Sequence, residues 1–425
     1  MLNRGEHDGQ VNKGRVGPAL NDRGSDRIEG SEQSMQDKIW TALDNFSIEL
    51  PSWGFANTGT RFGKFTQAAA ASTIDEKFSD AAQVNALTGA SPTIALHVLW
   101  DMPGGVQGVP LIRELEEQHG IRAGSINPNL FQDAQYKFGA VCNPDPGIRK
   151  QALQHILDSI EIGKQLGSRD VSLWIADGSN YPGTQSISRR IGWMEEVFSA
   201  SHAALGPEQR MLIEYKPFEP AFYHTDIADW GMALELARNA GPKARVLVDT
   251  GHHYQAQNIE QIVAWLLRLN MLGGFHFNDR RYADDDLTLG SIDPYQVFRI
   301  FAEILGSEHV EAVSGIVYMI DQSHNLKGKM EAMVQTVMTA QELYAKAALV
   351  DQKRLAELQD SCHLVEAEEC FRGAFWQDVR PMLRSWRAAR GLREDPLKAL
   401  REGGYVERIT GERAQRNSKA VATYA

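Results

Sequence analysis

Cysteine is scarce in this chain: three of its 425 residues are cysteines, and no Cys-x-x-Cys pair occurs. Cys142, Cys362 and Cys370 therefore indicate neither a disulfide framework nor a thiolate zinc site. No apolar run reaches the roughly 18 to 20 residues that a membrane span requires. The chain also opens without the apolar stretch of a signal peptide. We therefore expect a cytoplasmic protein that has no membrane partner.

Basic residues are in the minority, since 44 Lys and Arg stand against 55 Asp and Glu and the net charge is −11. A surface of that sign repels phosphate backbones, so nucleic acid is not expected as a partner. Part of the acidic surplus can instead be concentrated at a cation site.

Three segments of the chain differ in composition. Residues 1–34 carry almost no large apolar side chains, which predicts a disordered N-terminal tail. Residues 35–328 are expected to form the catalytic domain. Residues 329–425 are expected to form a helical extension that serves oligomer contacts, because 329–360 is nearly continuous helix-forming sequence. From about Glu407 onward we expect a frayed tail.

From residue 47, short β-branched apolar runs alternate with longer segments of helical period. Eight such repeats predict an α/β fold in which a parallel sheet closes into a TIM (β/α)8 barrel. An open doubly wound sheet is the alternative, but the glycine-rich loop that usually follows its first strand is absent. The predicted strands are 47–55, 93–100, 123–128, 170–176, 211–216, 244–250, 273–279 and 315–321.

Four polar residues stand at or near the ends of the last four predicted strands: Glu214, Asp249, His276 and Asp321. The carboxyl ends of barrel strands meet at one face, so these side chains are expected to converge. Three carboxylates and an imidazole repel one another unless a cation lies among them. Each residue alone has an ordinary structural explanation, such as a helix cap or a core histidine. Together they predict a metal site for Mn²⁺, Co²⁺ or Zn²⁺ rather than Ca²⁺.

A second group of possible ligands lies nearby in the sequence. His252 follows Asp249 by three residues, and Asp284 and Asp286 would face the same side of an extended loop. With Asp249 shared, these residues could hold a second cation. The alternative is a solvated acidic loop, which describes most runs of aspartate.

Other residues at the strand ends suit a sugar substrate. Lys216 lies two residues after Glu214 on the same strand face, where it could stabilise charge on a substrate oxygen or form a structural ion pair. His97 could act as an acid or base. Trp100 and Trp174 could form an aromatic wall against a sugar ring, although either could equally belong to the core.

The sequence resembles the xylose-isomerase-like barrels and, among them, the compact metal-dependent bacterial L-rhamnose isomerases. The resemblance covers the chain from about residue 36 to near its C-terminus. It is carried by SWGFANTGTRFGKF (52–65), LIEYKPFEPAFYHTD (212–226), VLVDTGHH (246–253), GGFHFNDRRYADDDLTLGSIDPYQVFRIF (273–301) and YMIDQSHN (318–325).

This resemblance implies two divalent cations per subunit, Mn²⁺ first and otherwise Co²⁺, Zn²⁺ or Mg²⁺. It implies a homotetramer in which Phe62 enters the pocket of an adjacent subunit. It also implies a substrate pocket that Trp174 lines, and Ser323, in the last matching phrase, is assigned to that pocket with Trp100. The first cation would be held by Glu214, Asp249, His276 and Asp321, and the second by Asp249, His252, Asp284 and Asp286.

The expected activity is the conversion of L-rhamnose to L-rhamnulose, with other aldoses accepted, by a two-metal-assisted hydride shift between C1 and C2. Lys216 would stabilise the oxygen at C1, Asp321 would help the hydroxyl proton to move, and His97 would open the ring. Proton transfer through an enediol is the alternative mechanism. One alternative function is a ketose 3-epimerase or another sugar isomerase of the same superfamily that acts by proton transfer. The other is a non-catalytic sugar-binding or metal-storage protein.

Overall fold

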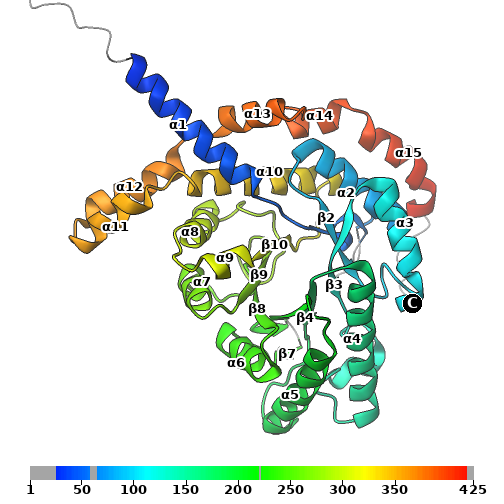
Figure 1. Ribbon diagram of the computed structural model, residues 1–425. Coiled ribbons are helices and arrows are strands. Elements are labelled where there is room, and N and C mark those ends of the chain that lie inside the picture. The colour runs from blue at the N-terminus through cyan, green and yellow to red at the C-terminus, as the bar shows by residue number, and fades with distance from the viewer. Residues whose placement is uncertain (1–24, 58–64, 220–221, 419–425) are drawn as a thin grey trace, which may run out of the picture.

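The computed structural model describes residues 25–57, 65–219 and 222–418, with side chains from residue 35 to residue 417. Eight parallel strands follow one another around a barrel in chain order (Figure 1). They are β1 (Leu50–Pro51), β2 (Thr93–His97), β3 (Arg122–Asn127), β4 (Asp170–Trp174), β5 (Arg210–Glu214), β8 (Ala244–Asp249), β9 (Leu272–Phe277) and β10 (Val317–Ile320).

The first and last strands meet, which closes the barrel. The Glu49 amide donates to the Tyr318 carbonyl at 2.8 Å, and the Ile320 amide donates to the Glu49 carbonyl at 3.0 Å. The predicted TIM barrel is therefore confirmed, and the open doubly wound sheet is excluded.

Helices cover the outside of this sheet, and local sequence signals set their ends. At α2, Thr73 and Glu76 form a reciprocal capping box, and Gly89 ends the helix with a φ of 69°. At α8, Asp293 caps the helix and Pro294 occupies its first turn. The surrounding helices are α2 (Ile74–Thr88), α3 (Val109–His119), α4 (Pro146–Leu166), α5 (Ile187–Ala204), α6 (Trp230–Ala240), α7 (Ile259–Arg268) and α8 (Pro294–Leu305).

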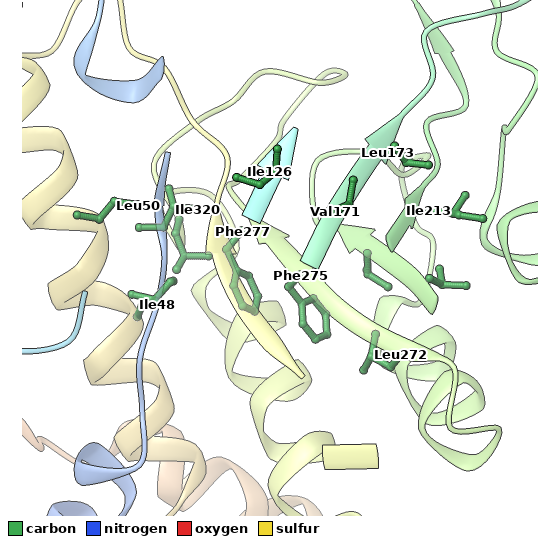
Figure 2. Close-up of a cluster of buried hydrophobic side chains, with 14 of the residues drawn as sticks. Ile48, Leu50, Ile126, Val171, Leu173, Ile213, Leu272, Phe275, Phe277 and Ile320 are labelled. Carbon is green, nitrogen blue, oxygen red and sulfur yellow. The ribbon is translucent and has the colours of Figure 1, made fainter. Parts of the chain in front are cut away.

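Two of the hydrophobic clusters belong to the barrel. The larger cluster lies between strands and helices, where side chains such as Ile213, Phe275 and Phe277 are buried (Figure 2). A small separate cluster contains Leu212, Leu247 and Met319. Each of these three precedes one of the predicted ligands Glu214, Asp249 and Asp321 by two residues, so it faces the same side of its strand. This cluster, which we call the apolar floor, therefore lies in the barrel interior beneath the predicted site.

The remaining helices form an extension along the barrel (Figure 1). The predicted helical run is present, interrupted between α10 and α11. Among the described residues, no helix is long and apolar enough to cross a membrane. The extension comprises α10 (Lys329–Ala347), α11 (Gln352–Asp360), α12 (Leu364–Trp376), α13 (Arg380–Ala389), α14 (Pro396–Glu402) and α15 (Tyr405–Ser418).

Two sequence predictions about the ends of the chain need correction. Helix α1 (Ser25–Asp44) begins well inside the segment predicted as a disordered tail, of which residues 1–24 lie outside the described residues. The predicted frayed tail after Glu407 is wrong, because α15 is helical there and buries Ile409. Partners distant in sequence supply this order, and the clearest is the contact of Arg413 with Asp80 of α2.

We expect Arg413→Ala to destabilise the fold strongly. The guanidinium binds both Asp80 oxygens at 2.8 and 3.0 Å, and the two side chains are 3% and 1% exposed. Without Arg413, the Asp80 carboxylate is buried without its cationic partner. We expect the free energy of unfolding, measured by urea denaturation, to fall by about 3–5 kcal/mol. Arg408→Ala is the matched control, because its ion pair with Glu412 is exposed and contributes at most about 0.5 kcal/mol. Equal losses in the two variants would contradict the assignment.

Candidate metal centre and substrate cavity

The four polar residues at the late strand ends converge at one rim of the barrel. Glu214 ends β5, Asp249 ends β8, His276 lies in β9 and Asp321 follows β10. One ligand atom from each lies within 4.8 Å of the others. The Nδ1 atom of His276 is 3.2 Å from Glu214 Oε1, 3.7 Å from Asp321 Oδ2 and 4.0 Å from Asp249 Oδ2.

A second group adjoins the first through Asp249. Ligand atoms of Asp249, His252 and Asp284 also lie within 4.8 Å of one another. His252 Nε2 is 3.4 Å from Asp284 Oδ1 and 4.0 Å from the same Asp249 oxygen, Oδ2, that faces His276. The Nδ1 atom of His252 lies 3.0 Å from the Tyr215 carbonyl, and donation to that oxygen leaves Nε2 free as an acceptor.

Asp286 was predicted as a ligand of the second cation, but its side chain does not join the second group of ligand atoms. It lines the same cavity but does not belong to either compact group of ligand atoms. Its backbone has a φ of 48°, a conformation that non-glycine residues rarely adopt, so the loop does not continue in the extended form that the sequence argument assumed. Asp286 therefore remains a proposed ligand without the close geometry of the other residues.

The pKa values of the clustered residues are shifted by burial and by the charges of their neighbours. Burial raises the pKa of Asp249 to about 7, and the Glu214 and Asp321 carboxylates add to this effect. Burial also acts to raise the pKa of Glu214, but the neighbouring His276 and His252 outweigh it and lower that pKa to about 2. The pKa of His276 is raised to about 9 because the Glu214 charge outweighs burial. The cluster therefore favours positive charge among its carboxylates, which His276 and His252 supply in the absence of a metal.

Several buried ligand atoms lack a hydrogen-bond partner among the described residues. They are Glu214 Oε1, Asp284 Oδ1 and both ring nitrogens of His276. Unpaired buried polar atoms are costly unless something binds them. Carboxylate oxygens mixed with imidazole nitrogens suit a divalent transition metal. The residues present therefore fit a divalent cation in each group.

Lys216 lies beside the second group. Its Nζ is 2.7 Å from Asp284 Oδ2 and 2.8 Å from Glu219 Oε2, and it lies 5.1 Å from the centre of the Trp174 ring. Burial opposes its charge, but the two carboxylates raise its pKa, so the ammonium stays protonated. The structural ion pair that the sequence left open for Lys216 is therefore present, with Asp284 and Glu219 rather than with Glu214. Glu219 was missed from the sequence, although it follows Lys216 by three residues.

Aromatic side chains form one wall of the site. The His97 ring lies 4.0 Å from the Trp100 ring, and Phe131 stands edge-on to Trp174 at 4.7 Å. Burial lowers the pKa of His97 to about 4, so its imidazole is neutral. The nearby carboxylate of Asp101 accepts a hydrogen bond from the His97 backbone amide rather than from its ring.

These elements enclose a cavity of about 610 Å³. Sequence analysis missed Trp53, whose indole donates to Asp321 Oδ1 at 2.8 Å, because its contact crosses most of the chain. Ser323 lies outside the cavity lining and accepts a hydrogen bond from Lys329. Phe62 lies outside the described residues. The lining residues are Trp53, Ala56, Asn57, Lys77, His97, Trp100, Asn127, Phe131, Gln132, Trp174, Glu214, Lys216, Glu219, His252, His276, Asp284, Asp286 and Asp321.

Comparisons with known proteins agree with this architecture. The family described as "Xylose isomerase-like TIM barrel" matches residues 100–322. A "Probable sugar isomerase" of Mesorhizobium japonicum is 38% identical over 384 residues, which cover 89% of this chain and 88% of that protein. Another, of Rhizobium meliloti, is 39% identical with the same coverage.

A solved structure gives the same result for the fold alone. A xylose isomerase domain protein of Alicyclobacillus acidocaldarius superimposes with a TM-score of 0.50 at 14% identity. The match covers 71% of this chain and 99% of that one.

Proposed function

Because the chain belongs to the xylose isomerase-like TIM barrel family, we propose that it is a metal-dependent aldose–ketose isomerase. L-Rhamnose, with L-rhamnulose as its product, is the substrate that we propose first, and other aldoses are expected to be accepted. Similarity to two proteins named as probable sugar isomerases supports the sugar class. The homotetramer implied by the sequence resemblance stays a prediction.

One observation carries the proposal more than any other. Two groups of ligand residues share Asp249 Oδ2, and a protonated lysine and an aromatic wall stand beside them in one cavity. A sugar-binding protein needs the wall but has no use for a buried ammonium between two carboxylates. A metal-storage protein needs neither the lysine nor the wall. An isomerase uses all three features.

The reaction moves one hydrogen between C1 and C2 and exchanges protons on the two attached oxygens. Two divalent cations, Mn²⁺ first, would supply Lewis-acid polarisation of the carbonyl and fix neighbouring oxygens. The first would be held by Glu214, Asp249, His276 and Asp321, and the second by Asp249, His252 and Asp284 with Asp286 as a further candidate.

The chain's own side chains have separate tasks in this proposal. The Lys216 ammonium stabilises negative charge on the oxygen at C1, since it remains protonated between its two carboxylates. Trp53 holds Oδ1 of Asp321, which leaves Oδ2 facing the first ligand group, and from that position Asp321 would help a hydroxyl proton to move. His97, neutral and beside Trp100, is the candidate base for ring opening. With the carbonyl polarised, we propose that hydrogen moves as hydride.

The test is to demetallate the protein, reload it with Mn²⁺, Co²⁺, Zn²⁺ or Mg²⁺, and assay L-rhamnose, L-lyxose, D-allose and D-xylose. We expect activity only after reloading, and little solvent deuterium in the product when the reaction runs in deuterium oxide. Substantial deuterium would replace the hydride shift with an enediol route. A ketose product altered only at C3 would identify an epimerase, and full activity without metal would overturn the proposal.

A further inference from the structure

The two oxygens of Asp249 have different surroundings. Oδ1 accepts hydrogen bonds from the Gly251 amide at 2.6 Å and from the side-chain amide of Asn278 at 3.0 Å. Oδ2 lies 3.3 Å from the same Asn278 nitrogen and 4.0 Å from both His276 Nδ1 and His252 Nε2. Oδ1 therefore accepts the two shorter hydrogen bonds, while Oδ2 accepts only the longer one from Asn278 and lies between the two groups of ligands.

Asn278 is itself held firmly behind the site. It is 1% exposed, and Thr250 Oγ1 accepts a hydrogen bond from its backbone amide at 3.0 Å and donates one to its carbonyl at 2.9 Å. Its side chain also requires the glycine at position 251. A Cβ added to Gly251 would lie 2.6 Å from Asn278 Oδ1, which is closer than real contacts allow.

We propose that Asn278 is a positioning residue that aims a single oxygen of Asp249 at both cation sites. This inference rests on the metal centre of the proposed function, not on the identity of the sugar. A neutral amide suits the task, because it fixes the carboxylate without cancelling the negative charge that attracts the cations. Without the amide, the carboxylate rotates about its terminal bond and no longer offers one shared oxygen in a fixed place.

The experiment measures Mn²⁺ binding to demetallated protein by titration calorimetry, so no turnover is needed. We expect wild-type protein to bind two ions and Asn278→Ala to bind both about 10–100-fold more weakly, as is typical when a group that orients a metal ligand is lost. Gly251→Ala should have an effect in the same direction without removing any hydrogen-bonding side chain, because its new methyl group displaces the Asn278 amide.

The double variant supplies the sharpest criterion. Gly251→Ala should add little to Asn278→Ala, because its methyl group then occupies the space that the amide has left. Thr250→Val is the control. It removes the Thr250 hydrogen bonds to the Asn278 backbone and the longer one, at 3.4 Å, to the Asn278 side-chain oxygen, but none to the Asp249 carboxylate. We expect it to lower the melting temperature and leave both affinities within about twofold of wild type.

The outcomes separate this inference from the proposed function. Unchanged affinities in Asn278→Ala, or losses in Thr250→Val as large as those in Asn278→Ala, would overturn the positioning role while the metal centre stands. A wild-type protein that binds no Mn²⁺ would overturn both. If Asn278→Ala does not fold, Gly251→Ala alone decides between a weakened and an unchanged pair of sites.

Discussion

We expect Asp249→Ala to abolish the binding of both cations and to lower aldose–ketose conversion by about 10³-fold or more, because Lewis-acid catalysis contributes several kcal/mol to such a reaction. The reason for the double loss is geometric. Asp249 belongs to both groups of ligand atoms, and its Oδ2 is equally far from His276 and His252. Elemental analysis of the purified variant, together with a sugar assay at saturating Mn²⁺, measures both effects.

Two comparisons make this result specific. His276→Ala should lose mainly one cation, because His276 belongs to the first group only. Asp170→Ala removes another buried carboxylate, one that begins β4 at the opposite end of the barrel and pairs with Arg210. We expect it to melt at a lower temperature but to keep both cations. Retention of two tightly held cations by Asp249→Ala would contradict the shared-ligand arrangement.

Lys216→Met is expected to lower kcat by about 10²–10³-fold while cation binding survives, since removal of one group that stabilises a developing oxyanion has an effect of this size. Lys216 touches Asp284 and Glu219 but belongs to neither group of metal-ligand atoms. The loss should therefore appear in turnover rather than in metal content. A non-catalytic sugar-binding protein would have no turnover to lose.

Lys243→Met is the matched control for this substitution. The Lys243 ammonium donates to the carbonyls of Leu205 and Gly206, away from the cavity. We expect this variant to keep the wild-type kcat. If Lys216→Met converts sugar at the wild-type rate with both cations bound, Lys216 is only a structural partner of Asp284.

The main features of the candidate site are predictable from the sequence because two regularities combine. Side chains alternate along a strand, and parallel barrel strands end at one rim, so residues at matching strand positions converge even when they are far apart in sequence. This reasoning brings together Glu214, Asp249, His276 and Asp321, which the structure places within 4.8 Å of one another.

The remaining features of the site depend on contacts between residues far apart in sequence and on loop conformation. Neither leaves a periodic pattern in the sequence. Trp53 contacts Asp321 where β1 and β10 meet to close the barrel, and Arg413 contacts Asp80 from the far end of the chain. The loop that carries Asp286 turns through a positive φ, so alternation in an extended segment does not describe it. The role of Asn278 cannot be predicted from the sequence, because it depends on the hydrogen bond between its side-chain amide and Asp249.

The apolar floor has a consequence for traffic through the enzyme. The barrel interior beneath the ligand residues is filled by three buried side chains, Leu212, Leu247 and Met319. They block passage through the barrel from its opposite end. In the proposed function, the cations and the sugar would then reach the site from the same rim of the barrel, the one at which the ligand residues converge.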